Sequence, residues 1–174
     1  MTPSRPLTQE ELDAWRSFVA ASTRLFGRLD AELRQATGIT LGDYEVLVLL
    51  SEAPEKRLRM GPLSDAALVS RSRLTYRVDQ LESTGLVCRE RCDTDRRGAW
   101  AILTPAGEDL LRRSFPTHRR GVVSYFADPV RTRLRPFAAA LEQVRASLGH
   151  RVAPSAATAS SGAPDGTGGT GGEG

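Results

Sequence analysis

Two segments of the chain concentrate side chains that bind anions. The first, SRSRLTYR at residues 70–77, mixes hydroxyl groups with Arg and Tyr. The second, CDTDRRGAWAILTPAG at residues 92–107, places two aspartates beside two arginines. A planar guanidinium binds phosphate oxygens or the edge of guanine through two parallel hydrogen bonds, and hydroxyl groups bind phosphate. Both segments therefore favour a negatively charged ligand.

The composition neither establishes nor excludes such a ligand. The 174 residues carry a net charge of only +3, and Lys56 is the single lysine, so the other cations are arginines. A GC-rich genome also produces an arginine-rich protein. The positions of the arginines, rather than their number, must therefore show whether they bind an anion.

Residues 70–83 are expected to form a helix with two different faces. Apolar side chains from Leu74 onward share one face of a helical wheel, and the first half of the opposite face is polar. Ser70 is a suitable N-cap, and Gly85 follows the end of the helix. The candidate DNA contacts here are Ser70, Ser72, Arg73, Thr75, Tyr76 and Arg77. A solvated helix face is the alternative interpretation.

The sequence around the second segment predicts a β-hairpin. Val87 on one side, and Trp100 and Ile102 on the other, are strand-forming residues in weakly alternating patterns, and a loop of about six residues would join the strands. Thr104 then caps a helix with Pro105 at its first position.

Helices account for most of the remaining chain before residue 150. Thr8 and Glu11 form a capping box for a helix of about 28 residues that ends at Gly38, and Thr40 caps the next helix. Further helices are expected over residues 62–68, from Thr104 with a kink or restart at Pro116, and from Asp128 to about residue 148.

This order of elements predicts a mainly α fold with a small β-hairpin wing. Residues 8–150 would form one winged helix-turn-helix protein, with the DNA-binding lobe at about 40–104 and long helices on both sides. In such a fold the second helix of the pair enters the major groove of double-stranded DNA. Residues 151–174 contain no aromatic residue, Leu or Ile, so we expect a disordered tail.

The same two segments resemble those of MarR-family transcriptional regulators. SRSRLTYRVDQLESTGLVCRE is similar to the family's recognition helix and first wing strand, and DTDRRGAWAILTPAG is similar to its wing signature. The matching positions of the signature are Asp95, Arg97, Ala101, Leu103, Thr104 and Gly107. The resemblance implies a ligand-responsive repressor that forms a homodimer through residues 8–38 and 105–149 and binds a pseudo-palindromic operator.

The resemblance also implies roles for three wing residues. Arg97 would reach into the minor groove, Asp95 would orient it or a neighbouring base, and Arg96 would contact phosphate. The chain departs from the family where Tyr76-Arg77 follows Leu74-Thr75, since relatives often have Arg and then an apolar residue there. This departure would alter the base preference.

Many members of this family bind a small, often phenolic effector in a crevice beside the dimerisation helices. The candidate lining residues here are Trp15, Phe18, Tyr44 and His118. Packing in the core is the alternative role for the aromatic residues, and a surface or interface position is the alternative for His118.

Other functional classes find less support in the sequence. Cys88 and Cys92 lie too far apart along one strand for a disulfide, yet oxidation of either is an alternative means of regulation. No spacing indicates a zinc site, a cofactor or an enzyme. A winged-helix module that binds proteins would be expected to lack the arginines of the wing. Without an apolar run of membrane-spanning length or a secretion signal, a cytoplasmic location is expected.

Overall fold

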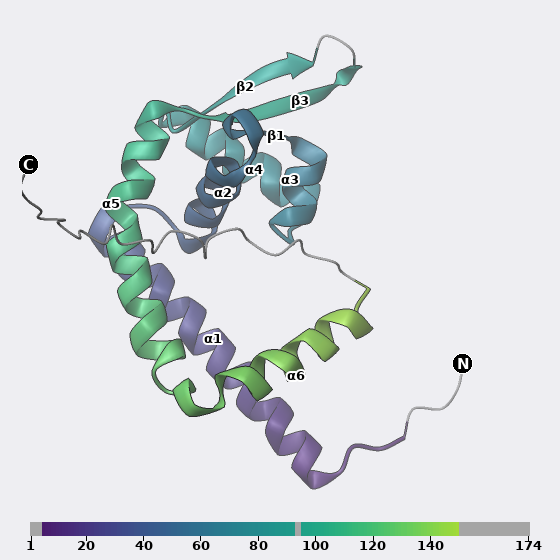
Figure 1. Ribbon diagram of the computed structural model, residues 1–174. Helices are drawn as coiled ribbons and strands as arrows, with labels where there is room; N and C mark the ends of the chain where they lie inside the picture. The colour runs from purple at the N-terminus through teal and green to yellow at the C-terminus, as the bar shows by residue number, and fades with distance from the viewer. Residues whose placement is uncertain (1–4, 93–94, 150–174) are drawn as a thin grey trace, which may run out of the picture.

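The computed structural model describes residues 5–92 and 95–149, and the expected tail at 151–174 lies outside these ranges. A compact lobe carries a small sheet, and two long helices run away from it (Figure 1). The lobe consists of α2 (Leu41–Glu52), β1 (Arg57–Arg59), α3 (Met60–Ala66), α4 (Arg71–Ser83), β2 (Val87–Cys92) and β3 (Asp95–Leu103). The remaining helices are α1 (Gln9–Thr37), α5 (Pro105–Val122) and α6 (Leu134–Ser147).

The predicted helix caps are confirmed. In α1, Thr8 and Glu11 form a reciprocal capping box, and Gly38 ends the helix with φ of 81°, a conformation that favours glycine. The side chain of Thr40 accepts from the backbone N–H of Asp43 at 3.0 Å at the start of α2. These ends depend on residues only three positions apart, which is why the sequence alone predicts them.

The hydrophobic core joins the lobe to the nearer ends of α1 and α5. The apolar face of α4 is buried, as its periodicity predicts, and it packs with α2 and the inner face of the sheet. The core comprises Leu29, Leu33, Ile39, Leu41, Tyr44, Val46, Leu47, Leu50, Leu63, Leu74, Val78, Leu81, Val87, Ala101, Leu103 and Leu110. This packing fixes the position of α4 in the lobe.

The sheet has one strand more than the predicted hairpin. Arg57–Arg59 forms β1 and pairs antiparallel with β3, so the strand order is β1-β3-β2. A three-residue strand has too short a pattern to be recognised before its partner is known. The loop of about six residues was also wrong, because β2 extends to Cys92 and β3 starts at Asp95.

Three helix predictions need correction. α3 begins at Met60 rather than Pro62. Pro62 therefore lies in the first turn of the helix, where its lack of an N–H costs no hydrogen bond, because the N–H groups of the first turn have no partner within a helix. α5 continues through Pro116 without a restart. Ser114 and Gly121, on either side of the proline, are both buried, and this packing keeps the helix continuous. α6 begins at Leu134 rather than near Asp128, after irregular turns.

Large apolar side chains remain exposed on α1 and α6. Trp15, Phe18 and Phe26 are each about half exposed on α1, and α6 buries none of its residues. The first half of α1 projects beyond the rest of the chain in Figure 1. Within residues 5–92 and 95–149, no helix has both the length and the apolar character needed to cross a membrane.

Candidate nucleic-acid interface

The first half of α4 presents polar side chains to solvent. The hydroxyl of Ser70 accepts from the backbone N–H of Arg73 at 3.3 Å, so the predicted N-cap is present. Ser72 and Arg73 are exposed beside it, and Tyr76 has an exposed fraction of 65%. The hydroxyl of Thr75 is also exposed and donates to the carbonyl of Arg71 at 2.9 Å. This face can therefore enter a groove without disturbing the core.

Arg77 differs from the other candidates on α4, because its guanidinium lies against α2. A Cβ built on Gly42 would lie 1.8 Å from Nη1 of Arg77, so the guanidinium occupies the space over that glycine. Nη1 is buried and has no hydrogen-bond partner among the described residues. The structure thus brings five of the six α4 candidates to the outer surface and directs the sixth inward.

The predicted contacts of the wing lie at the start of β3. The Cα of Asp95 pairs with that of Cys92, and the register shifts between Arg91 and Cys92. The hairpin extends away from α5 at the edge of the lobe (Figure 1). The side chains of Asp95, Arg96 and Arg97 lie outside the part of the structure that is described.

Arg89 on β2 joins the wing to α4, a role that the sequence analysis missed. Its Nη2 donates to the carbonyl oxygen of Thr75 at 3.1 Å, and its Nη1 bonds to the carboxylates of Asp79 and Glu82. Its backbone N–H also donates to Glu82 at 3.0 Å. The sequence did offer one signal, because Asp79 and Glu82 lie on the second half of α4, for which no DNA contact was predicted. Two acids alone do not show which residue they bind.

Thr104 fixes the other end of the hairpin. Its hydroxyl donates to the carbonyl oxygen of Gly85 at 2.7 Å and accepts from the N–H of Gly107 at 3.1 Å. Its backbone N–H donates to the carbonyl of Leu86 at 3.2 Å. One threonine therefore caps α5 and holds it against the turn between α4 and β2.

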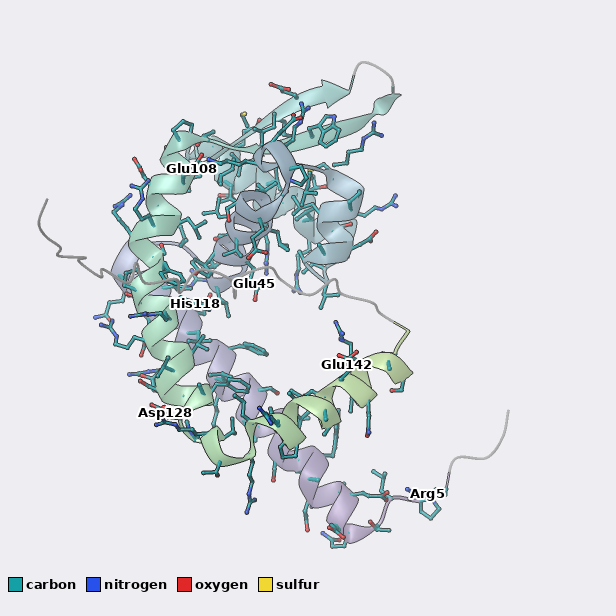
Figure 2. The ribbon with its side chains drawn as sticks, in the orientation of Figure 1. Arg5, Glu45, Glu108, His118, Asp128 and Glu142 are labelled. Carbon is teal, nitrogen blue, oxygen red and sulfur yellow. The ribbon has the colours of Figure 1, made fainter. Side chains whose placement is uncertain are left out.

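A crevice of about 610 Å³ lies between the lobe and α5. The ring of Tyr44 on α2 lies 4.5 Å from that of His118 on α5, centroid to centroid, and both residues line the crevice. Figure 2 labels Glu45 on α2 and His118 on α5, two of the residues that line the crevice. Trp15 and Phe18 lie elsewhere, exposed on the projecting half of α1 with ring centroids 6.1 Å apart. Two of the four predicted effector contacts therefore meet.

Burial controls the charge of the groups around this crevice. It lowers the pKa of His118, so the imidazole is held neutral, and it raises the pKa of Tyr44, as does the nearby charge of Glu52. Burial also raises the pKa of Glu45, although the positive charge of Arg77 acts in the opposite direction. The Nδ1 of His118 is buried and has no hydrogen-bond partner among the described residues.

The structure places the thiol of Cys88 at the surface of β2, as a free cysteine. The side chain of Cys92 lies outside the described part. Within the ranges that the structure covers, no three His, Cys, Asp or Glu side chains are grouped in a way that could hold a metal ion.

Comparison with known proteins relates the chain to one group of regulators. A sequence model of the MarR family matches residues 37–98. The crystal structure of Sco3205, a MarR family transcriptional regulator from Streptomyces coelicolor in complex with DNA, is 37% identical, with a TM-score of 0.79 over 84% of this chain and 92% of that chain. AbsC, a MarR family regulator from the same organism, is 36% identical with a TM-score of 0.78 over 85% of this chain and 100% of its own.

A curated relative matches a shorter stretch. The HTH-type transcriptional regulator MhqR of Bacillus subtilis (strain 168) is 35% identical over 81 residues, which are 47% of this chain and 54% of that protein. The chain thus spans about half the length of the curated relatives it matches.

Proposed function

The chain belongs to the MarR family, and we propose that it is a sequence-specific DNA-binding transcriptional regulator, most simply a ligand-responsive repressor, that acts as a homodimer in the cytoplasm. The observation that carries this proposal is the division of α4 into a buried apolar face and an exposed polar one. Its relatives are regulators rather than enzymes, so we propose no catalytic activity.

We assign base recognition to the exposed start of α4. Arg73 is suited to a bidentate contact with guanine, and Tyr76 extends far enough from the helix to contact a base or a phosphate. Ser70, Ser72 and Thr75 would bind phosphate and fix the register of the helix on the duplex. Arg77 would support α4 from within the lobe rather than contact DNA.

The wing would supply the second contact with DNA. Arg97 would enter the minor groove, with Asp95 orienting it and Arg96 at a phosphate. Arg89 supports this assignment, because its bonds to Thr75, Asp79 and Glu82 tie the wing to the recognition helix. The two DNA-contacting elements would then bind as one rigid unit.

We propose that the long helices form the dimer interface. The exposed Trp15, Phe18 and Phe26 of α1, and the apolar residues of α6, would be covered by the same surfaces of a second copy. Residues 8–38 and 105–149 would then place two DNA-binding lobes on a pseudo-palindromic site. An aromatic small molecule in the crevice beside Tyr44 and His118 would change the separation of the two lobes.

Selection of binding sites from a random pool of duplex DNA tests this proposal. We expect enrichment of two inverted half-sites whose centres are about one helical turn, or a multiple of it, apart. Arg73→Ala should weaken binding to the selected site by about 1–3 kcal/mol and relax the preference at one base pair. Arg112→Ala on the exposed surface of α5 is the matched control. Recovery of no enriched sequence would contradict sequence-specific binding.

A further inference from the structure

The crevice between the lobe and α5 has an unusual balance of charge. Its described lining residues are Tyr44, Glu45, Val48, Leu49, Ser51, Glu52, Ala66, Ala67, Leu68, Leu111, Phe115 and His118. Apolar and aromatic side chains dominate this set, and its two acids are accompanied by no Lys or Arg. Because His118 is held neutral, the lining carries negative charge only.

Glu45 is the acid best placed to bind a cation in the crevice. Glu45 lines the crevice from an exposed position on α2, and the partial burial of its carboxyl raises the pKa, which is a cost to the ionised form. Arg77 offsets part of this cost, but its guanidinium is directed to Gly42 of α2. A positive group entering from the crevice would complete the compensation.

The aromatic side chains favour the same chemistry. The buried Tyr44 and the partly buried His118 line the crevice with ring centroids 4.5 Å apart, and Phe115 contributes a ring that is about half exposed. The negative face of an aromatic ring attracts a cation at a distance of about 6 Å or less. Apolar walls, aromatic rings and a carboxylate together are suited to a large organic cation.

We propose that the effector bound in this crevice is a lipophilic organic cation rather than an aromatic carboxylate, with Glu45 as its counter-ion. This inference rests on the proposed function, since it names the ligand class of a regulator of DNA binding. An anionic ligand would meet the two acids and no described Lys or Arg in the lining, so its desolvation would not be compensated.

The position of the crevice gives the ligand a direct route to the recognition helix. Ala66 is the last residue of α3, Ala67 and Leu68 follow it in the turn before α4, and the three residues form one wall. Leu68 has a φ of 54°, which is strained for a residue other than glycine, and Ser70 caps α4 two residues later. A ligand pressed against this turn would shift the start of α4 and lower the affinity for DNA.

Tetraphenylphosphonium and tetraphenylborate test the charge preference, because they have nearly the same shape and opposite charge. Calorimetric titration of the full chain should show binding of the cation in preference to the anion. Glu45→Gln should weaken binding of the cation about five- to tenfold. Glu55→Gln, which removes an exposed acid paired with Arg57 outside the crevice, should leave binding unchanged. Preference for the anion, or equal affinity of wild type and Glu45→Gln for the cation, would overturn the proposal.

Binding to the selected DNA site separates this inference from the function on which it rests. We expect wild type to bind that site and to release it as tetraphenylphosphonium is added, whereas Glu45→Gln should need a correspondingly higher concentration. DNA binding that does not respond to the cation contradicts the inference alone. Failure of wild type to bind any DNA site contradicts the proposed function itself.

Discussion

Gly107 at the start of α5 packs so closely on Leu86 that a Cβ on Gly107 would lie 2.2 Å from the carbonyl oxygen of Leu86. The same oxygen accepts a hydrogen bond from the backbone N–H of Thr104 at 3.2 Å. The final glycine of the wing signature therefore has a structural explanation. It lets α5 approach the turn between α4 and β2 at the point where Thr104 joins them.

Gly107→Ala should destabilise the protein by about 1–3 kcal/mol, because the contacted atom belongs to the backbone and the helix must move away. Thermal or urea unfolding measures this change. Gly61→Ala is the control, since nothing lies within 4 Å of its added Cβ in α3 and alanine should not destabilise that helix. Equal stability of Gly107→Ala and wild type would contradict the close contact.

Arg89→Ala should uncouple the wing from the recognition helix. The variant leaves Asp79 and Glu82 without their partner and should lose about 1–3 kcal/mol of stability, since hydrogen bonds to charged groups are lost. Operator affinity should fall as well, although Arg89 faces α4 rather than solvent. Denaturation and DNA titration measure the two effects. Arg112→Ala, which breaks an exposed ion pair with Asp109, should change neither appreciably.

Arg97→Ala should reduce the salt dependence of operator binding by about one counterion while the protein keeps its fold and oligomeric state. Titrations at several salt concentrations give the slope of log affinity against log salt. The proposed role of the wing is contradicted if slope and affinity both match those of wild type.

His118 should make stability fall as the pH decreases. Its pKa is lowered by burial from the ordinary value of 6.5, so the unfolded chain binds a proton at a higher pH than the folded one. The folded state is consequently favoured in full above about pH 6.5, and this advantage is lost as the pH falls toward the lower pKa of the folded state. Urea unfolding at a series of pH values should show a smaller loss for His118→Gln than for wild type. Parallel profiles would show that His118 titrates alike in both states.

Short-range patterns in the sequence predicted much of the fold. Ser70, Thr40 and Thr104 lie next to the helices they cap, and Leu74 to Leu81 follow the period of a helix whose one side is buried. The expected restart at Pro116 was wrong, because contacts of α5 on both sides of the proline outweigh a local preference. The two cases differ in sequence separation. A helix cap depends on residues next to it in the chain, whereas a continuous α5 depends on packing against α1 and the lobe.

The order of the amino acids was enough to predict the caps, the apolar faces, the hairpin and the polar residues at the start of α4. Packing between distant segments is what pairs Arg57–Arg59 with β3, turns Arg77 toward Gly42 and lets Arg89 hold the wing to α4. It likewise brought Tyr44 to His118 and left Trp15 apart from them. These contacts join residues that lie far apart in the chain. Whether a given arginine or aromatic side chain points into the protein or toward solvent therefore depends on which elements the fold places beside it.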